Sequence, residues 1–159
     1  MSPAEGADRN DYLVRLRQEV DGWIELATGD MQAARTLMAN REENQPFTAA
    51  GHCQQAAEKF VKGTLVACRI DFKKTHDMEG LWELLPEQAT GLRAIPVQDI
   101  ATLTQYAVET RYPAPSPNPV ELHAPVSWSE VERAWATVLA VQTAALNEIA
   151  TRLAPAASQ

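Results

Sequence analysis

The sequence has few residues that are suited to redox, covalent or metal chemistry. Its 159 residues include only 2 cysteines and 3 histidines. Cys53 and Cys68 fall on one predicted helix, where their separation in sequence corresponds to roughly 22 Å, whereas a disulfide requires Cα atoms within about 7 Å. No Cys-x-x-Cys pair or Cys/His cluster has the spacing of a zinc site. We therefore expect two small core cysteines, no disulfide, no metal and no cofactor.

Long hydrophobic runs are also lacking. No apolar stretch approaches the roughly 20 residues that a membrane-spanning helix needs, and the polar N-terminus lacks the hydrophobic segment of a signal peptide. These absences predict a cytoplasmic protein with no membrane partner. Apolar residues make up 45% of the chain and charged residues 22%, as in an ordinary globular domain. We expect one domain over residues 11–153, between a disordered N-terminal tail at 1–10 and a C-terminal tail at 154–159.

Positive charge is scarce and local. The net charge is −7, whereas a protein that binds nucleic acid over a large surface is usually basic. The lysines all fall within one short segment that also contains Arg69, and they are Lys59, Lys62, Lys73 and Lys74. This cluster indicates either a basic patch on an acidic body or charges scattered over a solvated helix face.

Apolar residues recur at helical spacing along most of the chain, and no strand-like alternation persists. The periodicity predicts helices over residues 11–40, 46–69, 77–85, 98–110 and 128–153. Pro46 suits the start of the second helix, and Ser127 or Ser129 is expected to open the last. Prolines between positions 113 and 119 exclude a helix there and predict an extended loop. The expected fold is all-α, an antiparallel four/five-helix up-and-down bundle.

The second predicted helix carries a stripe of polar residues. His52, Gln55, Lys59 and Lys62 are spaced three, four and three apart, so they share one face of the helix. Glu58 can pair with Lys62 at i,i+4. Such a stripe can present donors to a phosphate or a base. Alternatively, it is a hydrated face or a buried polar seam between helices.

Two further segments carry polar residues at helix ends. In Thr75-His76-Asp77, the threonine or the aspartate is expected to cap the third helix, and the same helix start would suit an anion near His76. Arg111 and Tyr112 close the fourth predicted helix. A cation there is stabilised by the helix dipole, and its guanidinium also suits a phosphate.

Several of these segments match a known pattern when they are taken together. The pattern is a Gln-Gln-Ala-Ala-Glu-Lys helix, a lysine one turn later, Thr-His-Asp before a leucine-rich short helix, and a later Tyr-Ala-x-x-x-Arg-Tyr-Pro. Over roughly residues 20–150 the chain resembles the HEPN family of small prokaryotic helical domains. The resemblance implies a helical bundle that is usually a homodimer. It also implies a role beside a minimal nucleotidyltransferase in a toxin–antitoxin-like pair.

The sequence departs from the catalytic signature of this family. Many HEPN proteins are metal-independent ribonucleases in which an arginine is followed, after four to six residues, by a histidine at the start of a late helix. Here Arg111 is followed by a histidine only at His123, beyond the proline loop. Arg69 and His76 have suitable spacing, but they lie at the junction of the second and third predicted helices. We therefore assign no catalytic residue.

Three functions follow as hypotheses. The leading one is a non-catalytic HEPN domain that binds a nucleotide, RNA or a nucleotidyltransferase partner through His52, Gln55, Lys59, Lys62, His76, Arg111 and Tyr112. The second is a ribonuclease toxin with a noncanonical site made of Arg111 and one of the histidines. The third is a structural dimerisation module in which the long last helix, with Trp128 and Trp135, packs against a partner.

Overall fold

A computed structural model describes residues 3–109 and 126–154, with side chains described from residue 10 to 107 and from 126 onward. The described residues form helices and connections, with no strand among them. The helices are α1 (Pro3–Ala39), α2 (Pro46–Ala67), α3 (Met78–Glu83), α4 (Thr90–Arg93), α5 (Val97–Glu109) and α6 (Trp128–Leu153). None of the described helices combines the length and the apolar composition needed to cross a membrane.

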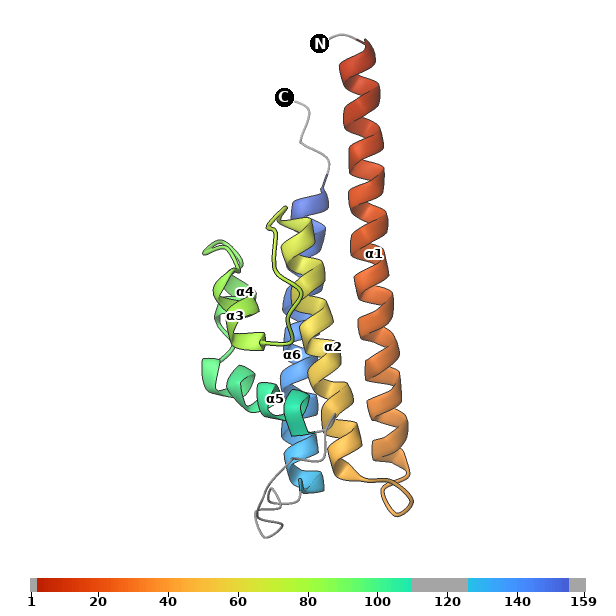
Figure 1. Cartoon of the computed structure of the whole chain (residues 1–159), viewed down its shortest axis with the longest axis vertical. Helices are drawn as coiled ribbons and strands as arrows, with labels where there is room; N and C mark the ends of the chain where they lie inside the picture. The colour runs from red at the N-terminus through yellow and green to blue at the C-terminus, as the bar shows by residue number, and fades with distance from the viewer. Residues whose placement is uncertain (1–2, 110–125, 155–159) are drawn as a thin grey trace.

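Helix α2 is the centre of the bundle. It packs along α1 and along α6, while the short helices α3, α4 and α5 gather on the side away from α1 (Figure 1). Helix α1 is antiparallel to α2, whereas α6 runs in the same direction as α2, and the chain returns to the start of α6 through α3, α4 and α5 (Figure 1). Because α2 has neighbours on most sides, 15 of its 22 residues are buried, including Phe60 and Leu65.

The small residues of α2 allow its neighbours to approach closely. Alanines are frequent along the helix, and a Cβ atom added to Gly63 would lie 3.1 Å from Trp23 Cβ on α1 and 3.9 Å from Ile149 Cδ1 on α6. After α2, Arg69 adopts a left-handed backbone conformation with φ 59°, and the N–H of Ile70 donates to the carbonyl of Leu65. This arrangement ends the helix and turns the chain back along α2.

The two cysteines are free, as the spacing predicts. Cys53 is completely buried on α2, and this burial raises the pKa of its thiol to about 12. Cys68 is partly buried just beyond the end of α2, where burial also raises the pKa of its thiol. Both groups are therefore protonated and poorly nucleophilic at neutral pH.

Several predicted boundaries are confirmed and others are wrong. Helices α2 and α6 begin where the sequence predicts, and Asp77 caps α3 by accepting a hydrogen bond from the N–H of Gly80. Helix α1 begins at Pro3 rather than at residue 11, because proline suits the first helical position and no second proline interrupts the helix that follows. Helix α4 was not predicted, because its four residues are too few to show a periodicity.

Candidate functional site along helix α2

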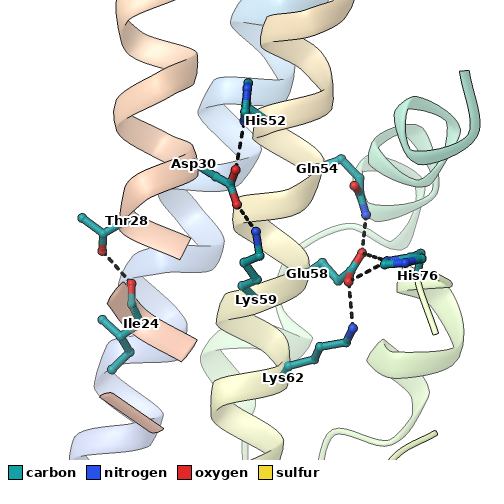
Figure 2. Close-up of polar contacts among 9 residues, drawn as sticks. All are labelled: Ile24, Thr28, Asp30, His52, Gln54, Glu58, Lys59, Lys62 and His76. Atoms are coloured by element: carbon teal, nitrogen blue, oxygen red, sulfur yellow. Dashed lines mark hydrogen bonds and ion pairs between the residues drawn. The ribbon is translucent and has the colours of Figure 1, made fainter. Parts of the chain in front are cut away.

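Glu58 is the centre of a buried polar cluster on α2. Its carboxylate accepts hydrogen bonds from Gln54 Nε2 at 2.7 Å, from Lys62 Nζ at 2.8 Å and from His76 Nδ1 at 3.0 Å (Figure 2). Gln54, Glu58 and Lys62 are one turn apart on the helix, whereas His76 comes from the connection between α2 and α3. Because a carboxylate can only accept, Nδ1 of His76 must carry the proton in this contact.

The hydrogen bonds to Glu58 control its ionisation. Burial alone raises the pKa of a carboxyl group, because it disfavours the charged form. Here the hydrogen bonds from Lys62, Gln54 and His76 and the charge of Lys62 outweigh burial, and the pKa of Glu58 lies below its ordinary value of about 4.5. Glu58 is therefore a buried anion at neutral pH, stabilised by an equally buried cation.

Lys62 is enclosed by groups from three parts of the chain. Its ammonium donates to Glu58 and, at 2.7 Å, to the carbonyl oxygen of Thr75 in the connection after α2. It also lies 5.6 Å from the ring centroid of Trp23 on α1 and 5.9 Å from that of Phe72. Both rings are within the range of a cation–π interaction. Lys62 therefore joins α1, α2 and the connection, and it is not presented to a ligand.

Gln54 is the least satisfied member of the cluster. The side chain is completely buried, and its Oε1 has no hydrogen-bond partner in the described structure. A rotation of the amide group would not solve this, because it would turn the oxygen toward the carboxylate of Glu58. The cluster therefore contains one buried acceptor that a donor would stabilise.

A second cluster lies on the side of α2 that faces α1. Asp30 of α1 accepts from His52 Nδ1 at 2.9 Å through one carboxylate oxygen and forms an ion pair with Lys59 through the other (Figure 2). Asp30 is mostly buried, and His52 and Lys59 are partly exposed. Asp30 and Lys59 line a shallow hollow of about 670 Å³ beside Gly29 and Leu26.

The predicted stripe is thus divided between two acids. His52 and Lys59 contact Asp30, whereas Lys62 contacts Glu58. Gln55, the fourth residue of the stripe, is partly buried. His76, predicted separately, joins the Glu58 cluster. Arg111 and Tyr112 lie outside the described residues, so their predicted proximity to the stripe stays a prediction.

Sequence reasoning did not assign three residues that organise these clusters. The i,i+4 spacing of Glu58 and Lys62 indicated their ion pair, but nothing in it indicated burial. Gln54 was visible only as part of the Gln-Gln-Ala-Ala-Glu-Lys motif. Asp30 gave no signal, because its partners are 22 and 29 positions away in the sequence.

The chemistry available to the described residues depends on which of them could bind a metal ion and which could transfer a proton. No group of three or more histidine, cysteine, aspartate or glutamate side chains within the described ranges is arranged to hold a metal ion. The Glu58–His76 pair has the form of a carboxylate that orients an imidazole, and His76 is half-exposed. Such a pair can fix a histidine tautomer for hydrogen bonding or proton transfer.

Comparison with known proteins identifies the fold and the family. The model of the HEPN domain matches residues 20–149, which is most of the chain. The chain belongs to the HEPN domain family. A search of curated proteins gave no significant match.

Two solved structures share the HEPN fold of this chain. The structure of TT1696 from Thermus thermophilus has a TM-score of 0.64 and 23% identity, covering 81% of this chain and 97% of that one. The archaeal HEPN homologue ST0689 has a TM-score of 0.57 and 22% identity, covering 82% of this chain and 97% of that one. At these identities the structural similarity establishes the helical fold of this HEPN domain, and it does not transfer an activity from either structure to this chain.

Proposed function

We propose that this HEPN domain is a non-catalytic, homodimeric binding component of a nucleotidyltransferase-linked, toxin–antitoxin-like system. The observation that carries the proposal is the pairing of both lysines of the stripe with acids. Lys59 is paired with Asp30, and Lys62 is paired with Glu58 inside the protein. A phosphodiester-cleaving site needs positive charge directed at the reacting phosphate. These two lysines instead neutralise carboxylates of their own chain, which favours a binding role.

The proposed ligand is a nucleotide, or a nucleotide-bearing surface of the partner. Gln55 is the stripe residue with no ion-pair role, and its amide can both donate to and accept from a base edge. Arg111 and Tyr112 come two and three residues after the end of α5 in the sequence, and α5 packs against α2. We assign the phosphate contact to Arg111, whose fork matches phosphate oxygens, and a stacking contact with the base to Tyr112.

Thermal unfolding in the presence of ATP, AMP or inorganic phosphate tests this proposal. A ligand at 100 times its Kd stabilises the folded state by about 2.7 kcal/mol, so binding raises the melting temperature. Arg111→Ala should abolish the shift, and Gln55→Ala should reduce it. Arg133→Ala removes an exposed arginine from α6 and serves as the matched control that keeps the shift. If none of the three compounds moves the melting temperature of the unmodified protein, nucleotide binding is wrong.

The link to a partner is tested separately. A nucleotidyltransferase encoded beside this chain, co-expressed with it, should elute with it as one complex on size-exclusion chromatography. If the two proteins elute separately at concentrations well above those in the cell, the nucleotidyltransferase is not a partner. Nucleotide binding is then decided by the thermal unfolding experiment alone.

One observation favours a second candidate function, a ribonuclease with a noncanonical site. Glu58 orients His76 through Nδ1, as a proton-transferring histidine requires. Purified protein would then cleave RNA in the presence of a metal chelator, and both His76→Ala and Arg111→Ala would abolish cleavage. If neither substitution changes the cleavage rate, the nuclease is a contaminant. If no cleavage occurs, the binding function alone stands.

A further inference from the structure

The exposed face of α6 lacks charge over four turns. Between Arg133 and Glu148 no residue is acidic or basic, although 22% of the whole chain is charged. The inner side of this segment faces the core and includes Val138 and Val141. The outer side is exposed to solvent and consists of Ala136, Leu139, Ala140, Thr143, Leu146 and Asn147. A solvated helix face normally carries charged residues, and the centre of a protein interface is depleted of them.

Two large apolar side chains lie along this face. Leu139 is 42% exposed and Leu146 is 37% exposed. They form one stripe with Trp135 and Gln142, which are partly buried, because the four residues are spaced four, three and four apart. Exposed leucines and valines also occur elsewhere, but several lie beside charged residues. Leu84 and Leu26 each follow a glutamate directly in the sequence, and the pair Leu13-Val14 lies between Asp11 and Arg15.

We propose that this face of α6 binds the same face of a second copy, with the two helices antiparallel. This inference rests on the homodimer of the proposed function and names the surface that forms it. A twofold axis between positions 142 and 143 would place Leu139 opposite the partner's Leu146, and Leu146 opposite the partner's Leu139. The same axis would place Trp135 opposite the partner's Ala150, where a small side chain leaves room for the indole.

The residues nearest the proposed axis are compatible with contact between identical copies. Gln142 would lie near the partner's Gln142, and an amide can donate to and accept from an identical amide. No like charges would meet at the centre, because the segment from 134 to 147 has none. A seam of this length spans roughly 20 Å. A seam of one helix from each copy buries less surface area than a permanent interface does, so we expect a dimer that dissociates on dilution.

Sedimentation velocity over a range of protein concentrations tests the surface. The unmodified protein should shift from monomer to dimer as concentration rises, and Leu139→Glu should remain a monomer at every concentration. Leu84→Glu is the matched control, because Leu84, at the end of α3, has the same exposed fraction of 42%. That variant should dimerise normally. Circular dichroism melting of each variant confirms that it is folded.

A mixture of two variants tests the antiparallel register. Leu139→Lys and Leu146→Glu should each be monomeric alone, because each new charge would be buried without a partner against a leucine of the second copy. Mixed in equal amounts they should form a heterodimer, in which one lysine meets one glutamate and one leucine meets one leucine. A mixture that stays monomeric would overturn the register.

The outcomes separate the surface from the homodimer itself. A dimer that persists in Leu139→Glu overturns the assignment to α6 but keeps the homodimer. An unmodified protein that is monomeric at all concentrations overturns both. Neither result bears on nucleotide binding, which is measured with Arg111→Ala.

Discussion

Lys62 Nζ lies 2.8 Å from Glu58 Oε1, and both side chains are almost fully buried between α1, α2 and the connection to α3. The pair explains why a charged residue is tolerated at the centre of the bundle. The carboxylate is satisfied by three donors, and the ammonium is satisfied by a carboxylate, a carbonyl and two aromatic rings. It also predicts that losing one partner is costly, because the other charge remains buried.

The substitution Lys62→Met tests this pair. It keeps most of the side-chain volume and removes the ammonium, which leaves Glu58 buried without its cation. We expect a loss of about 3–5 kcal/mol in the free energy of unfolding, measured by urea denaturation. The double variant with Glu58→Gln should recover part of the loss. A cost no larger than that of a surface variant would show that Glu58 is solvated.

The control for Lys62→Met is another i,i+4 pair. Asp11 and Arg15 on α1 have the same spacing, but both side chains are well exposed. Surface pairs of this kind contribute at most about 1 kcal/mol. Arg15→Met should therefore change the free energy of unfolding by that amount or less.

Stability should fall in acid through Glu58. Its pKa is lower in the folded protein than the ordinary value of about 4.5, because the hydrogen bonds from Lys62, Gln54 and His76 outweigh burial. A lowered folded-state pKa contributes stability above the unfolded-state pKa, and this contribution is lost as the pH falls through the folded-state pKa. The unfolding free energies of the unmodified protein and of Glu58→Gln should therefore differ at pH 7 and converge as the pH falls through the lowered folded-state pKa of Glu58. A difference that stays constant with pH would contradict this role.

The local features of the chain were predictable, and the role of the stripe was not. Pro46 and Ser127 mark helix starts by their own chemistry, and Asp77 caps the helix that follows it. The burial of Lys62 depends on Trp23 and Phe72, which come from other elements. Helical periodicity gives the face on which a residue lies, but on a central helix it does not tell which faces the neighbours cover.

The same reasoning applies to the candidate site. The stripe lies on one helix, as the spacing predicts, and Lys62 fits the alternative interpretation of the stripe as a buried polar seam between helices. The acids that divide it could not be read from the pattern, because Asp30 reaches His52 and Lys59 only through the packing of α1 on α2. A contact between two helices depends on their crossing and register, which single-helix spacing does not contain.

Two glycines should respond in opposite ways to alanine. A Cβ atom at Gly63 would lie 3.1 Å from Trp23 Cβ, so Gly63→Ala requires Trp23 on α1 to shift by a few tenths of an ångström in a closely packed contact. We expect a loss of about 1–3 kcal/mol in unfolding free energy, as for other overpacked core positions. A Cβ atom at Gly29 would meet nothing within 4 Å, so Gly29→Ala should stabilise α1 by up to about 1 kcal/mol. Equal effects of the two substitutions in urea denaturation would show that the packing at Gly63 is loose.

Helix α6 depends on the capping box at its start. Ser127 Oγ accepts from the N–H of Glu130, and the carboxylate of Glu130 accepts from the backbone N–H of Ser127 at 2.7 Å. Ser127→Ala should lower the free energy of unfolding by about 1 kcal/mol, because one N–H of the first turn loses its acceptor. Thr151→Ala is the control, since that hydroxyl only donates to the carbonyl of Asn147 within the helix.

The ionisation of Glu130 gives a second measure of the same box. Hydrogen bonds from the backbone N–H of Ser127 and then from its hydroxyl hold the pKa of Glu130 below its ordinary value. In Ser127→Ala the backbone N–H remains and the hydroxyl is lost. The pKa of Glu130, followed by NMR titration, should therefore rise only part of the way to its ordinary value. If the pKa returns fully to its ordinary value, the hydrogen bond from the backbone N–H of residue 127 is lost together with the cap. If the pKa is unchanged, the hydroxyl of Ser127 does not stabilise the carboxylate of Glu130.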